Sequence, residues 1–330
     1  MHYRQLGKDG PMVSSIGLGC WSFAGSYGPT DEAESHETLR KAIDLGVDFL
    51  DTANVYGMGV SETVIGTFIK DNPGKFKIAT KAGIWRNPET NAREFNNDPD
   101  YLRGELEKSL TRLGVDHVEL YYIHRREAAR PIEDVMETLM KFKEEGKIGG
   151  IGFSEISPGS LRRACAVGPV AGVQSEYSLW SRQPEMGVIQ ACKELGVAFL
   201  PFSPLARGMF GDKAPDPNEF PKGDFRNGTP RFVEPNFSYN LEAIDRFKAY
   251  AKSKGMASAT LALAWVLAQG EHLIALPGTR SAGHLEMDAA ATDLNLSETD
   301  LAEIEQVLPV GFAHGDRYSD QQLPGVERYC

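Results

Sequence analysis

The sequence predicts an α/β fold in which eight parallel strands close into a (β/α)8 TIM barrel, and three observations support this. Short apolar segments bounded by turn residues alternate with longer segments of helical periodicity. Eight such alternations favour a closed parallel barrel over a three-layer sheet. The length of 330 residues is also usual for a barrel of this kind.

The elements follow in chain order from an N-terminal β-hairpin, which we expect to turn at residues 7–10. The expected strands cover residues 15–19, 49–51, 76–81, 118–124, 148–153, 170–175, 197–202 and 272–276. The expected helices cover residues 31–45, 61–70, 99–113, 132–145, 158–166, 185–195, 240–254 and 258–268, with extra C-terminal helices at 282–291 and 297–307. Gly46 is expected to end the first helix, and Ser61 to cap the second.

Two stretches carry no clear periodicity. Residues 85–98 are rich in Asn and Pro and are expected to form a loop. Residues 206–236 are rich in Pro and Phe, and a loop of this length inside a compact domain is usually a lid or a binding loop. An inert surface excursion is the alternative for 206–236. We expect residues 1–330 to form a single domain, since no linker or internal repeat interrupts the pattern.

Composition limits the class of partner. The net charge of −11 argues against nucleic acid or an anionic membrane as the main partner, and no apolar run is long enough to span a bilayer. The four cysteines, Cys20, Cys165, Cys192 and Cys330, are scattered and form no CxxC pair. This pattern, together with an N-terminus that lacks an apolar signal core, predicts reduced thiols and a cytoplasmic protein. The oligomeric state stays open.

Four polar residues stand at or just after the ends of consecutive strands. Asp51, Lys81 and His124 end the second, third and fourth strands, and Tyr56 follows Asp51 by five residues. Each alone has an ordinary structural reading as a turn residue, a packed ring, a solvated cation or a buried histidine. The strands of a barrel present their carboxyl ends at one face, so the four are expected to converge.

These four residue types together suit the reduction of a carbonyl group. The oxygen of an aldehyde or ketone needs a proton as it receives hydride, and a tyrosine can donate it. We expect Lys81 to lower the pKa of Tyr56, Asp51 to hold Lys81, and His124 to orient the carbonyl. The hydride itself must come from a cofactor.

At these residues the sequence resembles the aldo-keto reductases. The stretch from Asp51 to Glu62 is similar to the family's first signature, and Lys81 and His124 fall where its other catalytic residues stand. The similarity continues through residues 152–155, 173–182, 202–208 and 276–280 and covers nearly the whole chain. The branch it resembles contains plant perakine-reductase-like and bacterial enzymes.

The resemblance implies a barrel that uses NADPH to reduce carbonyl groups, with NADH as a weaker alternative cofactor and a small carbonyl or alcohol compound as substrate. It implies Tyr56 as the general acid, with Asp51, Lys81 and His124 around it. The implied cofactor-binding residues are Cys20, Trp21, Asp51, Ser154, Gln174, Phe202, Ser203, Pro204, Leu205, Arg207, Gly208, Gly278, Thr279, Arg280, His284 and Asp288. The implied substrate pocket comprises Trp21, Tyr56, Trp85, His124 and Arg125.

Within the cofactor set, Ser154 and Gln174 are implied to hold the nicotinamide carboxamide and Phe202 to stack on its ring. Arg280 is the implied ligand of the 2′-phosphate, and Asp288 stands where an adenine-contacting Asn is usual. The family commonly has Asn where this chain has Glu155. Phe312, His314 and Tyr318 of the C-terminal tail are expected either to close the pocket or to pack against the barrel.

Other readings have less support. The glycine fingerprint of a Rossmann fold is absent, and no His, Cys, Asp or Glu cluster has the spacing of a metal site. A tyrosine and a lysine at residues 250 and 254 have the spacing of short-chain dehydrogenases, but they lie on a predicted surface helix. The functional alternative is a cofactor-binding regulatory module that resembles the potassium-channel β subunits.

Overall fold

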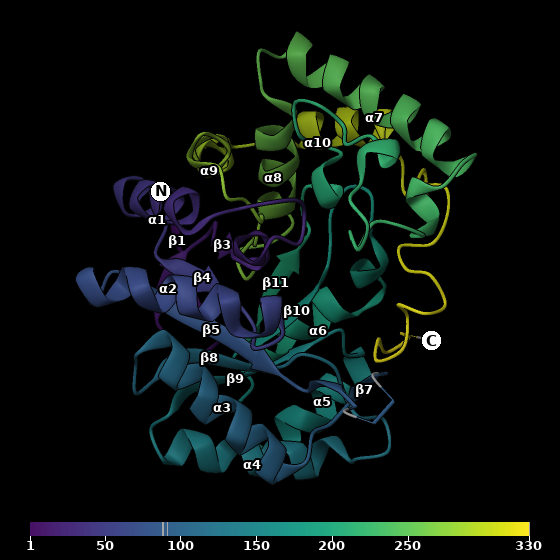
Figure 1. The fold of residues 1–330 in the computed structure, drawn as a ribbon. Coiled ribbons are helices and arrows are strands. Elements are labelled where there is room, and N and C mark those ends of the chain that lie inside the picture. Colours follow the sequence, from purple (N-terminus) through teal and green to yellow (C-terminus); the bar gives the residue numbers. More distant parts are fainter. Residues whose placement is uncertain (88, 91, 330) are drawn as a thin grey trace.

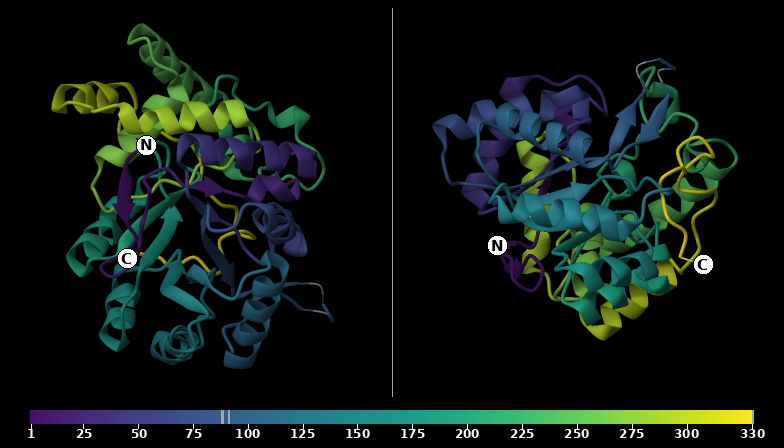
Figure 2. Two further views of the ribbon diagram at one scale, coloured as in Figure 1. Left: turned by 90° about the vertical axis from the view of Figure 1, so that its left-hand side faces the viewer. Right: turned by 90° about the horizontal axis from the view of Figure 1, so that it is seen from below.

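The computed structural model describes residues 1–87, 89–90 and 92–329, and it confirms the barrel. Seven parallel strands lie in the order β11-β10-β9-β8-β5-β4-β3, and helices surround them (Figures 1 and 2). The strands are β1 (Tyr3–Gln5), β2 (Met12–Ser14), β3 (Leu18–Gly19), β4 (Phe49–Asp51), β5 (Lys77–Ala82), β6 (Ile84–Arg86), β7 (Arg93–Phe95), β8 (Val118–Ile123), β9 (Ile148–Ser154), β10 (Gly172–Glu176) and β11 (Ala198–Phe202). The helices are α1 (Glu32–Leu45), α2 (Val60–Asp71), α3 (Pro99–Leu113), α4 (Ile132–Glu144), α5 (Pro158–Val167), α6 (Val188–Leu195), α7 (Asn236–Ser253), α8 (Ser258–Ala268), α9 (Ala282–Ala289) and α10 (Glu298–Val307).

The segment expected as the eighth strand closes the barrel through single bridges rather than through a continuous ladder. Leu273 and Leu276 pair with β11 on one side, at Phe199 and Phe202. Ala275 pairs with Ile16 on the other side, and Gly278 pairs with Gly19 of β3. The sheet therefore has seven regular strands, and residues 273–278 occupy the eighth position.

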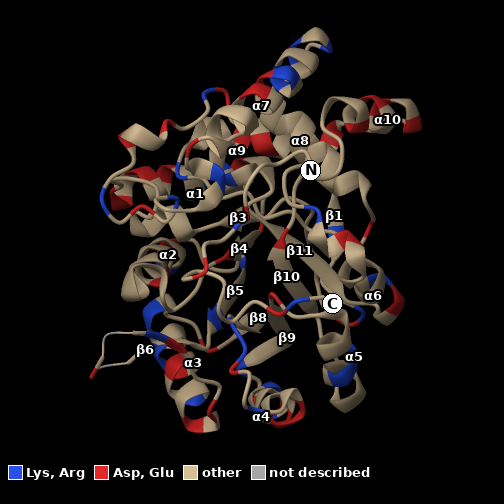
Figure 3. Ribbon diagram, turned by 90° about the vertical axis from the view of Figure 1, so that its right-hand side faces the viewer, with Lys and Arg blue, Asp and Glu red and all other residues tan. Residues whose placement is uncertain are grey.

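The hairpin of β1 and β2 covers the amino end of the barrel. Its residues Leu6 and Val13 are fully buried with Phe49, Leu120 and other inward-facing side chains of the strands. A second and larger apolar layer fills the space between the strands and the helices. Charged residues of both signs occur along the outer helices (Figure 3). None of the helices in the described ranges is both long and apolar enough to cross a membrane.

Helix ends follow the expected signals at several positions. Asp31 caps α1 by accepting a hydrogen bond from the Glu34 N–H, and Gly46 ends the helix at φ +74°. The prediction of Ser61 as a cap is wrong, because α2 begins at Val60 and Ser61 lies inside it. The Ser61 hydroxyl instead donates to the Cys20 carbonyl and accepts from the Thr52 hydroxyl, so it ties α2 to the strand ends.

The predicted loop at residues 85–98 contains a short antiparallel hairpin, in which β6 pairs with β7. Strands of three residues are too short to show a period-two pattern, so the Asn- and Pro-rich sequence concealed them. Two residues of this stretch, Pro88 and Asn91, lie outside the described residues.

Two predicted helix starts are also corrected. The helix expected at 185 begins at Val188, because Gly187 at φ +140° separates it from a short 3-10 helix at Gln183–Met186. The helix expected at 240 begins at Asn236. Asn240 is not at its end; its side chain holds the backbone of His314 through hydrogen bonds of 2.8 and 2.9 Å.

Candidate active site

The four strand-end residues meet at the carboxyl face of the barrel. Lys81 is fully buried and forms an ion pair with Asp51, and its ammonium donates 2.7 Å to the Thr52 carbonyl. The same ammonium lies 5.1 Å from the centre of the Tyr56 ring. The Tyr56 and His124 rings are 5.8 Å apart and nearly perpendicular. The predicted convergence of these residues is therefore present in the structure.

Burial and neighbouring charges set the protonation of this cluster. Burial raises the pKa of Asp51 and lowers the pKa of Lys81, which brings the two values closer together, while their mutual attraction opposes this. Burial, followed by Asp51, raises the pKa of Tyr56 well above its ordinary value. Among the neighbouring cations, Arg125 has the largest effect in lowering the Tyr56 pKa, whereas Lys81, expected to have that role, is paired with Asp51. Tyr56 is thus kept as a neutral phenol, which is the form that can donate a proton.

His124 is held in its neutral form. Burial lowers its pKa well below the usual value, and the positive charges of Arg125, Lys81 and Arg93 add to this. Its Nδ1 atom is buried without a hydrogen-bond partner. A neutral imidazole can still donate one hydrogen bond and so can orient a carbonyl oxygen.

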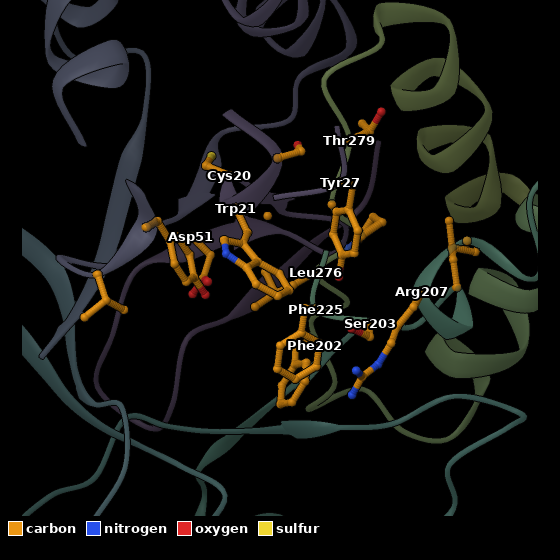
Figure 4. A pocket seen from close by; sticks show the side chains of 18 of the residues that line it. Cys20, Trp21, Tyr27, Asp51, Phe202, Ser203, Arg207, Phe225, Leu276 and Thr279 are labelled. Carbon is orange, nitrogen blue, oxygen red and sulfur yellow. The ribbon is translucent and has the colours of Figure 1, made fainter. Parts of the chain in front are cut away.

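These residues line one cavity of about 880 Å³, which is within the size range of cofactor and small-molecule sites. Tyr56, Asp51 and His124 form part of its wall, whereas Lys81 is buried behind them. The rings of Trp21, Tyr27 and Phe225 lie against one another inside it (Figure 4). Of the implied substrate-pocket residues, Trp21, Tyr56, His124 and Arg125 line the cavity. Trp85 does not, but its neighbours Ile84 and Arg86 do.

All but one of the implied cofactor residues line this same cavity. They are Cys20, Trp21, Asp51, Ser154, Gln174, Phe202, Ser203, Pro204, Leu205, Arg207, Gly208, Gly278, Thr279, Arg280 and His284. Asp288 is the exception: it is buried in α9 and is not among the lining residues. The Gln174 side-chain amide donates 2.8 Å to Asp51, which links the implied carboxamide site to the four-residue cluster.

The backbone after β11 has an unusual conformation. Ser203, Ala206 and Arg207 adopt φ values of +50°, +52° and +56°, which non-glycine residues rarely do. Such strain is concentrated at functional sites, where a required geometry outweighs its cost. Ser203 and Arg207 of this turn line the cavity, and so does Arg226. The residues present therefore fit an extended anionic cofactor such as a nicotinamide dinucleotide.

Arg280, the implied ligand of the 2′-phosphate, lines the cavity. Its Nε is 3.3 Å from a carboxylate oxygen of Glu34, which also lines the cavity. The Thr38 hydroxyl donates 2.6 Å to the Arg280 carbonyl and fixes the backbone there. A phosphate bound by Arg280 would therefore share its guanidinium with an acidic neighbour.

The C-terminal tail crosses the carboxyl face of the barrel and is anchored by buried charges. Arg317 binds Glu155 through both of its Nη atoms, at 2.9 and 2.5 Å, and lies 3.6 Å from Glu176. Arg207 donates 2.8 Å to the same Glu176. Glu155, where the family commonly has Asn, is therefore used here to hold the tail. Figure 1 shows the tail running along one side of the molecule, and near its end the Glu327 N–H donates 2.9 Å to the Glu155 carbonyl.

The tail contributes to the cavity through other residues than expected, since Gln321 and Gln322 line it. Tyr318 lines it, but Phe312 and His314 do not. His314 instead stacks on Tyr239 with a centroid distance of 4.8 Å.

Several lining residues were not singled out from the sequence. They are Tyr27, Glu34, Arg86, Arg93, Phe225, Arg226, Gln321 and Gln322. The Pro- and Phe-rich composition of 206–236 predicted a lid or a binding loop, and Phe225 and Arg226 of this segment line the cavity. No local signal marks the hairpin or tail residues, because only the fold brings them to the cavity.

Comparison with known proteins agrees with this geometry. The model of the Aldo/keto reductase family matches residues 15–309. The chain belongs to the aldo/keto reductase family. This membership supports an oxidoreductase that binds a nicotinamide cofactor, with NADP-dependent carbonyl reduction as its general class of chemistry.

Individual relatives match over nearly their full length. The chain is 40% identical to a protein of Schizosaccharomyces pombe named aldo-keto reductase yakc [NADP(+)], over 96% of this chain and 94% of that protein. It is 39% identical to probable aldo-keto reductase 1 of Glycine max, over 95% and 91%. Among solved structures, the glycerol dehydrogenase AKR11B4 from Gluconobacter oxydans superposes with a TM-score of 0.83 at 31% identity, over 93% and 94%.

Free thiols complete the description of the site's surroundings. Cys20, Cys165 and Cys192 are unpaired, as expected, and Cys330 lies outside the described residues. Cys20 lines the cavity, and burial raises its pKa, so its thiol is kept protonated next to Asp51.

Proposed function

We propose that this protein reduces aldehydes or ketones to alcohols with NADPH, and that Tyr56 is the general acid. The observation that carries the proposal is the placement of Tyr56 and His124, edge to face at 5.8 Å, on the wall of the cavity that also holds the implied cofactor residues. A carbonyl oxygen between these two rings would meet a phenol and an imidazole at once. The cofactor, when bound, supplies the hydride.

Each residue of the cluster has a separate task in this proposal. As the carbonyl double bond is reduced, the oxygen takes the phenolic proton of Tyr56, and solvent later replaces that proton. The cations Lys81 and Arg125 stabilise the phenolate that remains. Asp51 keeps Lys81 in position, and His124 donates a hydrogen bond that fixes the direction of the oxygen. General acid catalysis of this kind contributes a rate factor of about 100 to 10,000.

The test is to follow the oxidation of NADPH with a panel of aromatic aldehydes and ketones, with NADH in parallel. We expect measurable turnover with NADPH and weaker turnover with NADH. Nucleotide binding without turnover on any carbonyl compound would contradict the proposal and would favour a cofactor-binding regulatory module. The cluster of acid, cation, carboxylate and imidazole supports the enzyme instead.

We further propose that Arg280 binds the 2′-phosphate of NADPH and that Glu34 limits the strength of that contact. The support is their ion pair of 3.3 Å at the cavity wall, since a charge-assisted bond to phosphate is worth about 1.5–3 kcal/mol. Arg280→Ala should weaken NADP⁺ binding about tenfold or more and NAD⁺ binding much less. Glu34→Gln should strengthen NADP⁺ binding.

Dissociation constants measured by tryptophan fluorescence in the absence of substrate provide the readout. Arg40→Ala is the matched control, because Arg40 is an exposed cation on the same helix as Glu34 and does not line the cavity. Equal losses for NADP⁺ and NAD⁺ in Arg280→Ala would contradict the phosphate assignment.

A further inference from the structure

Cations gather at the end of the cavity that holds His124. Arg93 and Arg125 line it, and the charges of both lower the pKa of His124. Within the described part of the chain, the carboxylates that line the cavity are Asp51 and Glu34. Both are already paired, with Lys81 and Arg280 respectively. The wall near His124 therefore carries a positive charge that no lining carboxylate balances.

Arg125 is buried beside the reacting groups without an acidic partner. Its Nη1 donates 2.6 Å to the His124 carbonyl and 2.9 Å to the Ser154 hydroxyl, and both acceptors are neutral. Its Nε is buried and has no hydrogen-bond partner. Glu155 attracts Arg125 at longer range, since Arg125 helps to lower the Glu155 pKa, but Glu155 forms its ion pair with Arg317. A buried guanidinium with no described carboxylate within ion-pair distance is stabilised when a ligand supplies the opposite charge. Arg125 lines the cavity, so a ligand there can reach it.

Arg93 lies on β7 of the short hairpin, where it is exposed, and lines the same cavity as Arg125. Its guanidinium lies over the Phe95 ring at 5.2 Å and makes one long contact of 3.4 Å to the carbonyl of Gln322 in the tail. No described carboxylate lies within ion-pair distance of it. Partial desolvation and, after it, repulsion from Arg125 lower the pKa of Arg93. An anion near both would relieve that repulsion.

The rest of this end is aromatic. The centre of the Trp21 ring lies 5.9 Å from that of Tyr56 and 5.5 Å from that of Phe225. The centres of the Phe225 and Tyr318 rings are 6.0 Å apart. These rings provide an apolar surface next to the two arginines. The cavity thus offers an acid for a carbonyl, an apolar wall, and two cations, one buried and one exposed.

We propose that the substrate is an aldehyde or ketone that also carries a carboxylate, which Arg125 and Arg93 bind while the apolar part of the molecule packs against Trp21 and Phe225. This rests on the proposed carbonyl reduction. A carboxylate matches the planar edge of a guanidinium. The chain has a net charge of −11 and would by itself repel an anionic substrate. The positive charges of Arg93 and Arg125 would offset this repulsion at the cavity.

The experiment compares 4-carboxybenzaldehyde with its methyl ester, which keeps the ring and the aldehyde but removes the charge. With NADPH at low ionic strength, we expect kcat/KM for the acid to exceed that for the ester about tenfold or more, as for a charge-assisted contact of about 1.5–3 kcal/mol. Added salt should reduce this ratio. Arg93→Gln should bring the ratio toward unity, whereas Arg162→Gln should keep it, because Arg162 is paired with Glu194 on the outer surface.

Calorimetric titration with benzene-1,4-dicarboxylate adds a measurement that needs no turnover: the dianion should bind the wild type more tightly than Arg93→Gln. Equal constants for acid and ester in the wild type would overturn the inference and leave the proposed reduction standing. Lack of NADPH oxidation with either compound would count against the reduction itself. A clear preference for a phosphorylated aldehyde over the carboxylated one would overturn the assignment of a carboxylate.

Discussion

At the scale of single residues, burial decides what each group in the site can do. Tyr56 and His124 are both kept neutral, although charged groups surround them. Lys81 was expected to lower the Tyr56 pKa, but its ammonium is paired with Asp51, and Arg125 is the cation with the largest effect on the phenol. The residue types of the site followed from the sequence, while their electrostatic coupling depended on distances that only the fold sets.

Asp288 gives a pH-dependent prediction at this scale. One of its carboxylate oxygens is buried without a partner, and burial raises its pKa to about 8. The native state therefore holds this proton more tightly than the unfolded chain. The contribution of Asp288 to the free energy of unfolding is therefore fully present below the pKa of an unfolded aspartate. This contribution is lost as the pH rises toward about 8.

Asp288→Asn removes that titration. We expect the free energy of unfolding of the variant, relative to the wild type, to rise by about 1–3 kcal/mol between mildly acidic and mildly alkaline pH. Urea unfolding at the two pH values measures it. If the variant and the wild type differ in free energy of unfolding by the same amount at both pH values, Asp288 does not titrate in this range.

The sequence could indicate the four catalytic candidates because each ends an apolar strand or follows one closely. Arg93, Phe225 and Tyr318 have no such mark, since they come from a hairpin, a long loop and the tail. Their role depends on contacts between segments far apart in the chain, which no local pattern records. Trp85 illustrates the same limit, because a strand of three residues presents its neighbours to the cavity instead.

At the scale of elements, the site is assembled from strand ends and closed by segments held through buried ion pairs. Glu176 at the end of β10 is the centre of this network. Burial would raise its pKa, but Arg207, Arg317 and Arg231 together lower it to about 2. The charged form is thus favoured in the native state, and its contribution to stability is lost only as pH falls from about 4.5 toward 2.

Arg317→Gln tests the anchoring of the tail. The change leaves Glu155 buried without its bidentate partner, so we expect the free energy of unfolding to fall by about 3–5 kcal/mol at neutral pH. Limited proteolysis should also cut the tail sooner. Arg162→Gln, which removes an exposed ion pair, should cost less than about 1 kcal/mol. Equal effects of the two variants would show that the tail pair is not a structural anchor.

At the scale of the whole molecule, the two ends of the barrel have separate tasks. The carboxyl end carries the cavity, and the hairpin of β1 and β2 fills the amino end with Leu6 and Val13. The count and order of strands were predictable from alternation and length. The weak pairing of residues 273–278 was not, because it depends on how the curved sheet meets its own first strand. That residues 1–330 form a single domain stays a prediction.

Leu6→Ala separates these two tasks. Leu6 is fully buried among the inward-facing side chains, so its truncation should lower the free energy of unfolding by about 2–5 kcal/mol. The kcat of the folded enzyme should stay within about twofold at low temperature, since the change lies at the end of the barrel opposite to Tyr56. A large loss of kcat without loss of stability would contradict this division.

The central claim is that Tyr56 donates the proton to the carbonyl oxygen, and Tyr56→Phe tests it most directly. This change removes one oxygen atom and keeps the ring that packs against Trp21 and His124. We expect kcat for aldehyde reduction with saturating NADPH to fall about 100- to 10,000-fold, while NADPH still binds. A Tyr56→Phe variant that reduces aldehydes at nearly the wild-type rate would contradict the account.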